Sequence, residues 1–394
     1  MKIVFTGGGT GGHIFPIIAI CRELRRIYPK KDLKIVYLGP KDEFGKILLS
    51  QEGVKVKTTM AGKIRRYWSF GSFFLNLIDI FFKIPFGFFQ AFLYLFVSGP
   101  DLIFSKGGYG SIPTVSAGWF LGIPIFLHES DLSPGLSNQF LSKFTTEIFV
   151  SFPRTEYFSQ NKMILVGNPI RREILEGSKE KAKELFKLSN EKPIILILGG
   201  SQGAQRINDV ILVILPEILK EFELIHQAGS KNFKQVRKEA EVIAPDELKK
   251  YHHLWPFLKE EELKQAYAVS DLIVGRAGAG TIFEIAALSK PSILIPLPEA
   301  AQNHQLKNAY AFSQNGATMV IEEVNFTPGF FLERIKYLFS HPSEMEKMQN
   351  SARDIQRFAP PIATPTFGRK TIPKNIKFTK NKKGVIFFKE VKGI

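Results

Sequence analysis

The sequence predicts an α/β protein made of two Rossmann-like domains that face a cleft. Two corners about 190 residues apart carry this prediction, because each runs from an apolar strand through a glycine-rich loop into a helix. The first corner comprises residues 3–13 and the second residues 194–204. Glycines permit the tight turn, and the N–H groups at the start of a helix can bind an anion. Two such corners indicate that both domains bind one nucleotide-bearing ligand.

Short apolar runs alternate with helical patterns along most of the chain, which is typical of parallel sheets covered by helices. The first series of expected strands comprises residues 3–5, 34–38, 102–104, 125–127, 148–150 and 163–166. The second series comprises residues 194–198, 223–226, 272–274 and 292–295. We therefore expect an N-terminal domain over residues 1–166, a C-terminal domain over residues 167–355 and a basic tail over residues 356–394, with the cleft near residues 166–169.

Composition agrees with two globular domains. The chain has 394 residues, of which 44% are hydrophobic and 23% charged, so it can form full cores. Cys21 is the single cysteine, which excludes an internal disulfide and fits a reducing compartment. The chain begins with a strand and not with the pattern of a signal peptide.

The net charge of +16 is concentrated in the tail, where residues 369–394 hold nine Lys or Arg and one acid, Glu390. This tail is either a solvated segment or a contact with an anionic surface. No helix-turn-helix, zinc-finger or RNA-binding signature accompanies it, so we expect lipid and no nucleic acid as the partner.

An aromatic stretch lies in the first half. Arg65, Arg66, Tyr67 and Trp68 precede nine phenylalanines between residues 73 and 96. Polar residues interrupt the stretch, and Gly71, Pro85 and Gly87 predict breaks in the helical run, so a membrane-spanning helix is not expected. Two interpretations stay open and are compatible: a buried helix pair, or a surface that enters a bilayer interface beside Lys63, Arg65 and Arg66.

The loop after the first strand satisfies the dinucleotide pattern G-x-G-x-x-G with Gly7, Gly9 and Gly12. A nicotinamide-binding unit also needs an acid at the end of its second strand, to bind the ribose hydroxyls. Here that strand ends in Gly39 and Pro40. The sequence therefore predicts no nicotinamide cofactor.

Polar groups follow two further strands of the first half. One loop contains Gly107, Gly108 and Tyr109, and it is either a ligand loop or a plain strand-to-helix turn. Glu129 and Asp131 follow another strand, where parallel sheets bind their ligands. Two carboxylates alone do not indicate a metal, so no metal site is predicted.

In the second half, residues 271–284 combine a buried strand, a loop of small residues and a helix expected to begin near Thr281. The small residues let a ligand approach the backbone, and the start of the helix favours phosphate. Glu284 lies one turn into the helix. Its carboxylate either accepts hydrogen bonds from a ribose diol or complements the helix dipole.

Five motifs occur in order: G-G-T-G-G-H at residues 8–13, H-E-x-x-x-x-P-G at 128–135, G-N-P-I-R at 167–171, G-G-S-Q-G-A at 199–204 and R-x-G-A-x-T-x-x-E at 276–284. Over residues 1–355 the chain resembles the MurG family of inverting N-acetylglucosaminyltransferases, which have the glycosyltransferase B fold. The resemblance implies transfer of N-acetylglucosamine from UDP-N-acetylglucosamine to the muramyl C4 hydroxyl of undecaprenyl-linked lipid I, giving lipid II in peptidoglycan synthesis. It also implies a peripheral enzyme on the cytoplasmic face of the bacterial cell membrane, with an anionic membrane surface as partner and no cofactor.

The resemblance assigns residues to the donor and to the acceptor side. The implied donor-binding residues are Thr10, Gly11, Gly12, Arg171, Ser201, Leu258, Ala279, Gly280, Thr281, Ile282, Phe283, Glu284 and Gln305. Gly107, Gly108 and Tyr109 are expected on the acceptor side, and Arg65, Arg66 and Trp68 at the membrane. Two departures are visible: His304 replaces a family glutamine, and Asp131 stands where many members have asparagine. The proline-containing tail after residue 357 is a third.

The general base that accepts the proton of the C4 hydroxyl stays open between His13, Glu129 and Asp131. His13 can equally stabilise the glycine loop without taking a proton. Three other functions stay open as well: another lipid-directed UDP-sugar transferase, a UDP-sugar epimerase, and a non-catalytic nucleotide-sugar-binding scaffold. The aromatic stretch favours the lipid-directed enzymes over the epimerase.

Overall fold

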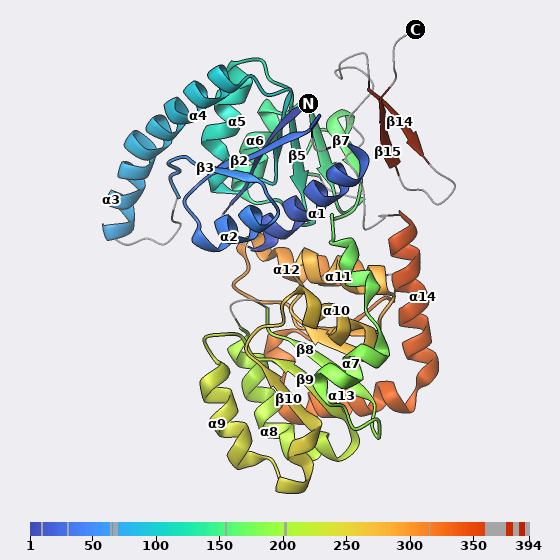
Figure 1. Cartoon of the computed structure of the whole chain (residues 1–394). Coiled ribbons are helices and arrows are strands. Elements are labelled where there is room, and N and C mark those ends of the chain that lie inside the picture. Colours follow the sequence, from blue (N-terminus) through green and yellow to red (C-terminus); the bar gives the residue numbers. More distant parts are fainter. Residues whose placement is uncertain are drawn as a thin grey trace. The chain divides into compact units, whose positions relative to one another are not determined.

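The chain forms two compact units (Figure 1). Unit 1 comprises Met1–Arg171 with residues 359–394, and unit 2 comprises Arg172–Phe358. The computed structural model describes residues 1–8, 11–29, 31–63, 65, 70–153, 156–200, 203–314, 316–358, 376–380 and 386–390. Both units are Rossmann-like, which confirms the predicted fold class. The cleft between the domains stays a prediction.

Within its described residues, unit 1 contains a seven-stranded parallel sheet with the order β3-β2-β1-β4-β5-β6-β7. Its strands are β1 Lys2–Thr6, β2 Lys34–Gly39, β3 Lys55–Thr58, β4 Leu102–Ser105, β5 Ile125–Glu129, β6 Glu147–Val150 and β7 Met163–Leu165. The sequence predicts all of these except β3. That strand reads Lys-Val-Lys-Thr and lies at the sheet edge with three of its four residues exposed, so it lacks the apolar run of a buried strand.

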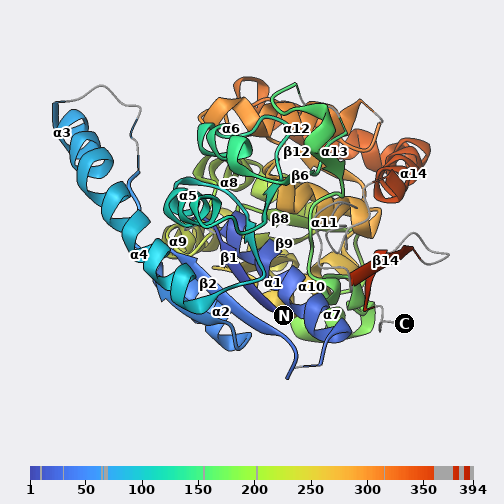
Figure 2. The same ribbon diagram turned by 90° about the horizontal axis from the view of Figure 1, so that it is seen from above.

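Helices cover both faces of this sheet (Figure 2). The helices of unit 1 are α1 Gly11–Ile27, α2 Glu43–Gln51, α3 Phe70–Ile78, α4 Ile84–Ser98, α5 Ile112–Phe120 and α6 Leu136–Leu141, of which α3 projects away from the sheet. Strand side chains alternate between the faces. Ile3 and Phe5 belong to the apolar cluster that contains Ile17 of α1, whereas Val4 belongs to the cluster that contains Val115 of α5. The carboxyl ends of the strands are thereby left to the loops that carry the polar motifs.

The aromatic stretch forms a nearly straight helical run in which a π-helical turn, η1 Asp79–Lys83, joins α3 to α4. The predicted breaks at Gly71, Pro85 and Gly87 are therefore wrong. Pro85 lies in the first turn of α4, directly after the π turn, where the wider turn accommodates a residue that lacks an N–H. Gly87 lets another chain segment pass, since a Cβ there would lie 1.9 Å from the Met60 carbonyl oxygen.

In unit 2, the described residues form a six-stranded parallel sheet with the order β10-β9-β8-β11-β12-β13. Its strands are β8 Ile194–Leu198, β9 Glu223–Gln227, β10 His252–Trp255, β11 Leu272–Gly275, β12 Ser292–Leu294 and β13 Met319–Val320. The predicted strands are confirmed. The sequence does not predict β10 and β13, which are the two edge strands of this sheet and are only half-buried.

The helices of unit 2 are α7 Lys179–Phe186, α8 Gln205–Glu221, α9 Phe233–Ile243, α10 Glu260–Val269, α11 Ala279–Leu288, α12 His304–Ser313, α13 Pro328–Ser340 and α14 Pro342–Phe358. Helix α11 begins at Ala279, two residues before the predicted start. The hydrophobic core of unit 2 contains apolar residues of β8, such as Ile195, and of the buried face of α8, such as Ile211.

In the basic tail, β14 Ile376–Lys380 pairs antiparallel with β15 Ile386–Glu390. The sequence predicts an extended conformation from Thr371 onward, and these two strands agree with it. The other residues of the tail beyond Phe358 lie outside the described ones.

Candidate active site

In unit 1, the loops after β1, β4 and β5 meet at the carboxyl edge of the sheet. The backbone N–H of Lys106 donates to the Thr6 carbonyl (2.8 Å), and the Tyr37 hydroxyl donates to the Gly7 carbonyl (3.1 Å). These bonds hold the first glycine loop to its neighbours. Helix α1 begins at Gly11, so Gly11 and Gly12 occupy its first turn as predicted for an anion site. Thr10 lies outside the described residues.

The imidazole of His13 lies against glycines of two loops. A Cβ on Gly8 would be 3.0 Å from His13 Cε1, and a Cβ on Gly108 would be 3.1 Å from His13 Nε2. Desolvation and then the nearby Lys106 ammonium lower the pKa of His13 to about 4. His13 is therefore neutral near pH 7, and it is a weaker base than a free histidine.

A buried cation, Lys106, lies at the centre of the three loops. Its Nζ is 2.8 Å from His128 Nδ1 and also donates to the Ser130 hydroxyl. Because an ammonium only donates, His128 accepts at Nδ1 and donates from Nε2 to the Gly167 carbonyl (2.9 Å). Burial lowers the pKa of Lys106 to about 8, although the carboxylates of Glu129 and Asp131 oppose this shift.

Glu129 ends β5 and is 5% exposed. One carboxylate oxygen accepts the Asp131 N–H (2.9 Å), and the other accepts the Asn138 Nδ2 amide (2.7 Å). Burial, followed by the charge of Asp131, raises the pKa of Glu129 to about 7, while Lys106 acts in the opposite direction. A carboxylate with this pKa has the properties of a general base that operates near neutral pH.

Asn138 of α6 joins Glu129 to the loop after β4. Its Oδ1 accepts the Gly108 N–H (3.0 Å), and Ser111 Oγ donates to the Gly107 carbonyl (2.8 Å) on the same loop. Gly107 and Gly108 have φ angles of +81° and +80°, which favour glycine. Tyr109 follows and is half-buried. The site therefore joins the predicted Gly107, Gly108, Glu129 and Asp131, and Tyr109 is the next residue on the same loop.

Sequence reasoning missed Lys106, Asn138 and Asn168. Asn168, in the G-N-P-I-R motif, accepts the Ser130 hydroxyl proton at Oδ1 (2.7 Å). The same motif ends in Arg171, which is buried in unit 1 with its guanidinium 4.4 Å from the centroid of the Phe15 ring on α1. The one signal in the sequence was the position of Lys106 directly after the apolar strand β4, where parallel sheets bind their ligands.

In unit 2, Gln227 at the end of β9 connects two predicted donor segments. Its Nε2 donates to the Gly200 carbonyl (3.2 Å), and its Oε1 accepts the Leu258 N–H (2.9 Å). The side chain of Leu258 is buried, so its backbone is the part that this arrangement fixes. Ser201 lies outside the described residues. The sequence analysis did not predict Gln227.

The first turn of α11 presents small residues. Gly280 is exposed and Thr281 half-buried, and the first N–H groups of a helix have no intrahelical acceptor. The side chains of Ala279, Ile282 and Phe283 are buried, so their contribution to binding would come from the backbone.

Glu284 is held by a neighbouring helix, because its Oε2 accepts a hydrogen bond from the Tyr267 hydroxyl of α10 (2.9 Å). We expect Glu284→Ala to weaken UDP binding by about 1–3 kcal/mol, the scale of a hydrogen bond to a charged group. Tyr267→Phe should cause a smaller loss, since it removes only the group that orients the carboxylate. Calorimetric titration with UDP measures both. Glu261→Ala, on the exposed face of α10, is the matched control, and an unchanged affinity in a folded Glu284→Ala variant would exclude this role.

The segment before α12 is held in a strained conformation. Gln302 and Asn303 have φ angles of +58° and +53°, which non-glycine residues rarely adopt. His304 Nδ1 lies 2.7 Å from the Ala301 carbonyl oxygen, and Gln305 Oε1 accepts the Leu297 N–H (3.1 Å). Gln305 therefore fixes the loop after β12. Its contact with a donor sugar stays a prediction.

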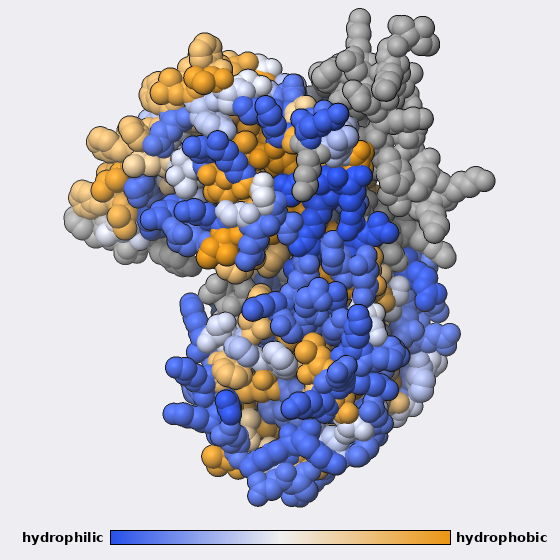
Figure 3. All heavy atoms as spheres, in the orientation of Figure 1, coloured by the Kyte–Doolittle hydropathy of each residue, from blue (hydrophilic) through white to orange (hydrophobic). Residues whose placement is uncertain are grey.

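The aromatic helices of unit 1 form a large exposed apolar surface (Figure 3). Residues 71–98 are long and apolar enough to cross a membrane by length and composition alone, and 17% of the most apolar window is buried. One face of α4, with Gly87, Ala91 and Leu95, is buried. The apolar surface comprises Phe73, Phe74, Leu75, Ile78, Ile80, Phe81, Phe82, Phe86, Phe89, Leu93, Phe96 and Val97, with Trp119 and Phe120 at the end of α5.

A charged segment runs alongside these helices. The backbone N–H of Lys63 donates to the Asp79 carboxylate (3.1 Å), and that of Arg65 donates to Asn76 Oδ1 (2.8 Å). Asp79 is buried and forms ion pairs with Arg65 (2.9 Å) and Lys83 (2.5 Å), whose hydrogen bonds lower its pKa against the effect of burial. Arg66 and Trp68 lie outside the described residues.

Comparison with known proteins agrees with this geometry. Residues 3–150 match the glycosyltransferase family 28 N-terminal domain, and residues 194–361 match the glycosyltransferase family 28 C-terminal domain. A relative from Clostridium tetani is 34% identical over 354 residues, covering 89% of this chain and 94% of its own, and is named UDP-N-acetylglucosamine–N-acetylmuramyl-(pentapeptide) pyrophosphoryl-undecaprenol N-acetylglucosamine transferase.

Two solved structures share the fold. MurG of Acinetobacter baumannii has a TM-score of 0.67 at 24% identity, covering 90% of this chain and 94% of its own. A UDP-GlcNAc 2-epimerase from Neisseria meningitidis has a TM-score of 0.61 at 16% identity, covering 91% of this chain and 99% of its own. The fold is thus common to transferases and epimerases, and the sequence relatives decide between them. The chain belongs to glycosyltransferase family 28 and, within it, to the MurG family of N-acetylglucosamine transferases.

Proposed function

We propose that this protein transfers N-acetylglucosamine from UDP-N-acetylglucosamine to the C4 hydroxyl of the muramyl sugar of lipid I, forming lipid II for peptidoglycan synthesis. One observation carries the lipid-directed part of this proposal. The unit that holds the polar network of Lys106, Glu129 and Asn138 also carries the exposed apolar surface over α3 and α4. A lipid-linked acceptor needs both on one unit, whereas an epimerase with a soluble substrate needs no such surface.

Most of the donor contacts are assigned to unit 2. The N–H groups at the start of α11 suit the diphosphate, and the carboxylate of Glu284, fixed by Tyr267, suits the ribose hydroxyls. Gln227 holds the glycine loop and Leu258 in register for the nucleotide. Arg171 is the cation that the family motif places near the diphosphate, and this contact stays a prediction.

The chemical step moves one proton. The C4 oxygen forms a bond to the anomeric carbon, the bond from that carbon to the UDP oxygen breaks, and UDP leaves with the electron pair. We assign the released proton to Glu129, because its carboxylate is held by Asn138 and the Asp131 N–H and has a pKa near 7. Lys106 then stabilises the ionised form of Glu129 before each turnover. His13 lies against the glycine loop and positions it.

The membrane contact is assigned to α3 and α4, lying in the interface without crossing the bilayer. The charged segment with Lys63 and Arg65 pairs with Asp79 near the middle of the helical run, and these charges would lie in hydrocarbon if the run spanned the membrane. One face of α4 is also buried against unit 1. We propose a peripheral enzyme on the cytoplasmic face, where a single buried thiol such as Cys21 stays reduced.

We expect the triple variant Phe82→Ser, Phe89→Ser and Phe96→Ser to bind anionic vesicles at least about tenfold more weakly, since each ring loses apolar burial. Vesicle co-sedimentation measures this. A variant with Val213, Val242 and Val324 of unit 2 changed to serine is the matched control, because these side chains are at least 66% exposed. Equal binding by both variants would assign the membrane contact elsewhere.

The function is tested by incubating the protein with labelled UDP-N-acetylglucosamine and a short-chain lipid I analogue, and by measuring the product mass. We expect a product heavier by one N-acetylglucosamine residue. A parallel reaction with diacylglycerol tests the alternative lipid acceptor. Transfer to diacylglycerol alone would replace the proposed acceptor, and UDP binding without any transfer would indicate a scaffold.

A further inference from the structure

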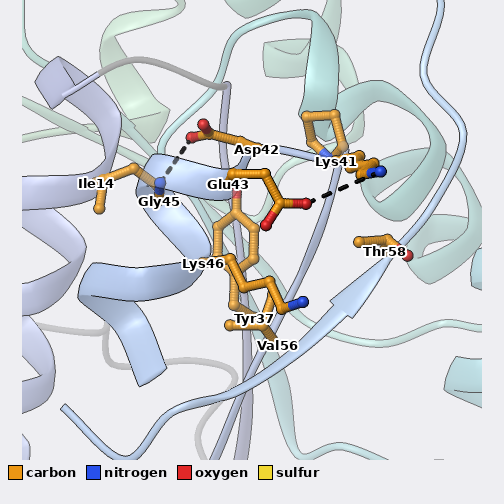
Figure 4. A pocket seen from close by; sticks show the side chains of 10 residues that line it. Ile14, Tyr37, Lys41, Asp42, Glu43, Gly45, Lys46, Val56 and Thr58 are labelled. Carbon is orange, nitrogen blue, oxygen red and sulfur yellow. Dashed lines mark hydrogen bonds and ion pairs between the residues drawn. The ribbon is translucent and has the colours of Figure 1, made fainter. Parts of the chain in front are cut away.

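A cavity of about 350 Å³ lies in unit 1 beside the loops described above (Figure 4). It lies at the carboxyl ends of β2 and β3 and at the start of α2. Ile14, Tyr37 and Val56 give it an apolar part, and Lys41, Asp42, Glu43, Lys46 and Thr58 give it a polar part. None of the functional motifs of the sequence accounts for it.

The cavity shares residues with the acceptor loops. The hydroxyl of Tyr37, which lines the cavity, donates to the Gly7 carbonyl of the first glycine loop. Pro40, another lining residue, lies so close to Gly110 that a Cβ there would be 2.5 Å from Pro40 Cδ. The cavity is therefore a direct neighbour of the loops after β1 and β4, with Tyr37 and Pro40 in contact with both.

The charges around the cavity have both signs. Lys41 and Glu43 are 3.9 Å apart and are 81% and 64% exposed in their side chains, so each can exchange its partner for a ligand group at little cost. Lys46 is exposed, and among the described residues it forms no ion pair. Asp42 caps α2, since its carboxylate accepts the Gly45 N–H at the start of that helix (3.1 Å). Two lysines and one available carboxylate surround an apolar floor.

We propose that this cavity binds the peptide of the acceptor, with Lys41 and Lys46 contacting its carboxylates and Glu43 its ammonium or amide N–H groups. The inference rests on the proposed function. The peptide is attached through the lactyl ether at C3 of the muramyl sugar, next to the reacting C4 hydroxyl, so it must leave the site close to the acceptor loops. A diphosphate fits less well, because it carries only negative charge and would face Glu43.

The experiment compares two lipid I analogues in the transfer assay, one with the pentapeptide and one with the lactyl group capped as an amide. We expect Lys41→Ala with Lys46→Ala to lower kcat/KM for the pentapeptide acceptor about five- to tenfold, the scale of two exposed charge contacts. The value for the capped acceptor should stay unchanged. Lys31→Ala with Lys34→Ala, at the opposite end of β2, is the matched control, since it removes the same charge from exposed positions.

Each outcome has one meaning. Loss confined to the pentapeptide acceptor supports the cavity as its binding site, and charge reversal by Lys46→Glu should deepen that loss. An equal loss with both acceptors overturns the inference and assigns the lysines to the diphosphate or the sugar. Unchanged transfer to both acceptors overturns it as well. If the unaltered protein transfers to neither acceptor, the proposed function fails, which is a distinct result.

Discussion

Glu129→Gln is expected to reduce kcat by about 10²- to 10⁴-fold, the contribution of a positioned general base. Glutamine has the shape of glutamate but cannot take the proton of the acceptor hydroxyl. Affinity for UDP should be unchanged, because Glu129 lies in unit 1, whereas Glu284 and Leu258, which are assigned to the nucleotide, lie in unit 2. Steady-state kinetics with the lipid I analogue and calorimetry with UDP measure the two effects.

A second variant, Lys106→Met, distinguishes a catalytic role of Glu129 from a structural one. Lys106→Met removes the charge that opposes the raised pKa of Glu129, so that pKa should rise further and the activity optimum should move to higher pH. His13→Gln should reduce kcat less than Glu129→Gln does. A kcat for Glu129→Gln within about threefold of the unaltered protein would remove Glu129 from the chemical step.

The second large effect is expected from Gly107→Ala. Alanine at a φ of +81° is strained, and its Cβ would lie 1.9 Å from Asn138 Oδ1. Asn138 would have to move, which breaks its bonds to Gly108 and Glu129. We expect the free energy of unfolding to fall by about 2–4 kcal/mol and transfer to fall with it.

Gly122→Ala is the matched control for this strain. Gly122 has a φ of +68°, and a Cβ there would have no neighbour within 4 Å. It should lose about 1 kcal/mol from backbone strain alone. Urea unfolding of both variants measures the difference, and equal losses would mean that the contact between Gly107 and Asn138 has no role in stability.

The two sheets could be predicted from the sequence because their central strands are continuous apolar runs followed by glycine loops. The edge strands β3 and β13 could not, since β3 alternates lysine with other residues and β13 has two residues. The π turn before Pro85 could not be predicted from the sequence either. A proline in an apolar run normally predicts a break, and only the wider turn accommodates it here.

The site was predictable in part for a similar reason. Glu129, Gly107 and Glu284 stand in motifs at strand ends or helix starts, where parallel sheets bind ligands. Lys106, Asn138 and Gln227 act through contacts with residues far away in sequence, such as the bond between Asn138 and Gly108, which are 30 residues apart. No local pattern encodes such a contact, so folding alone brings these groups together.

The assignment of Glu129 as the general base is tested by the pH dependence of kcat/KM for transfer to the lipid I analogue. Glu129 must be ionised to accept the proton, and its pKa is raised to about 7, so the rate should fall as the pH falls through about 7. If His13, with its pKa lowered to about 4, were the base, kcat/KM would not change with pH over that range. We predict the fall near pH 7. A kcat/KM that stays the same from pH 8 down to about pH 5 would exclude Glu129 as the general base.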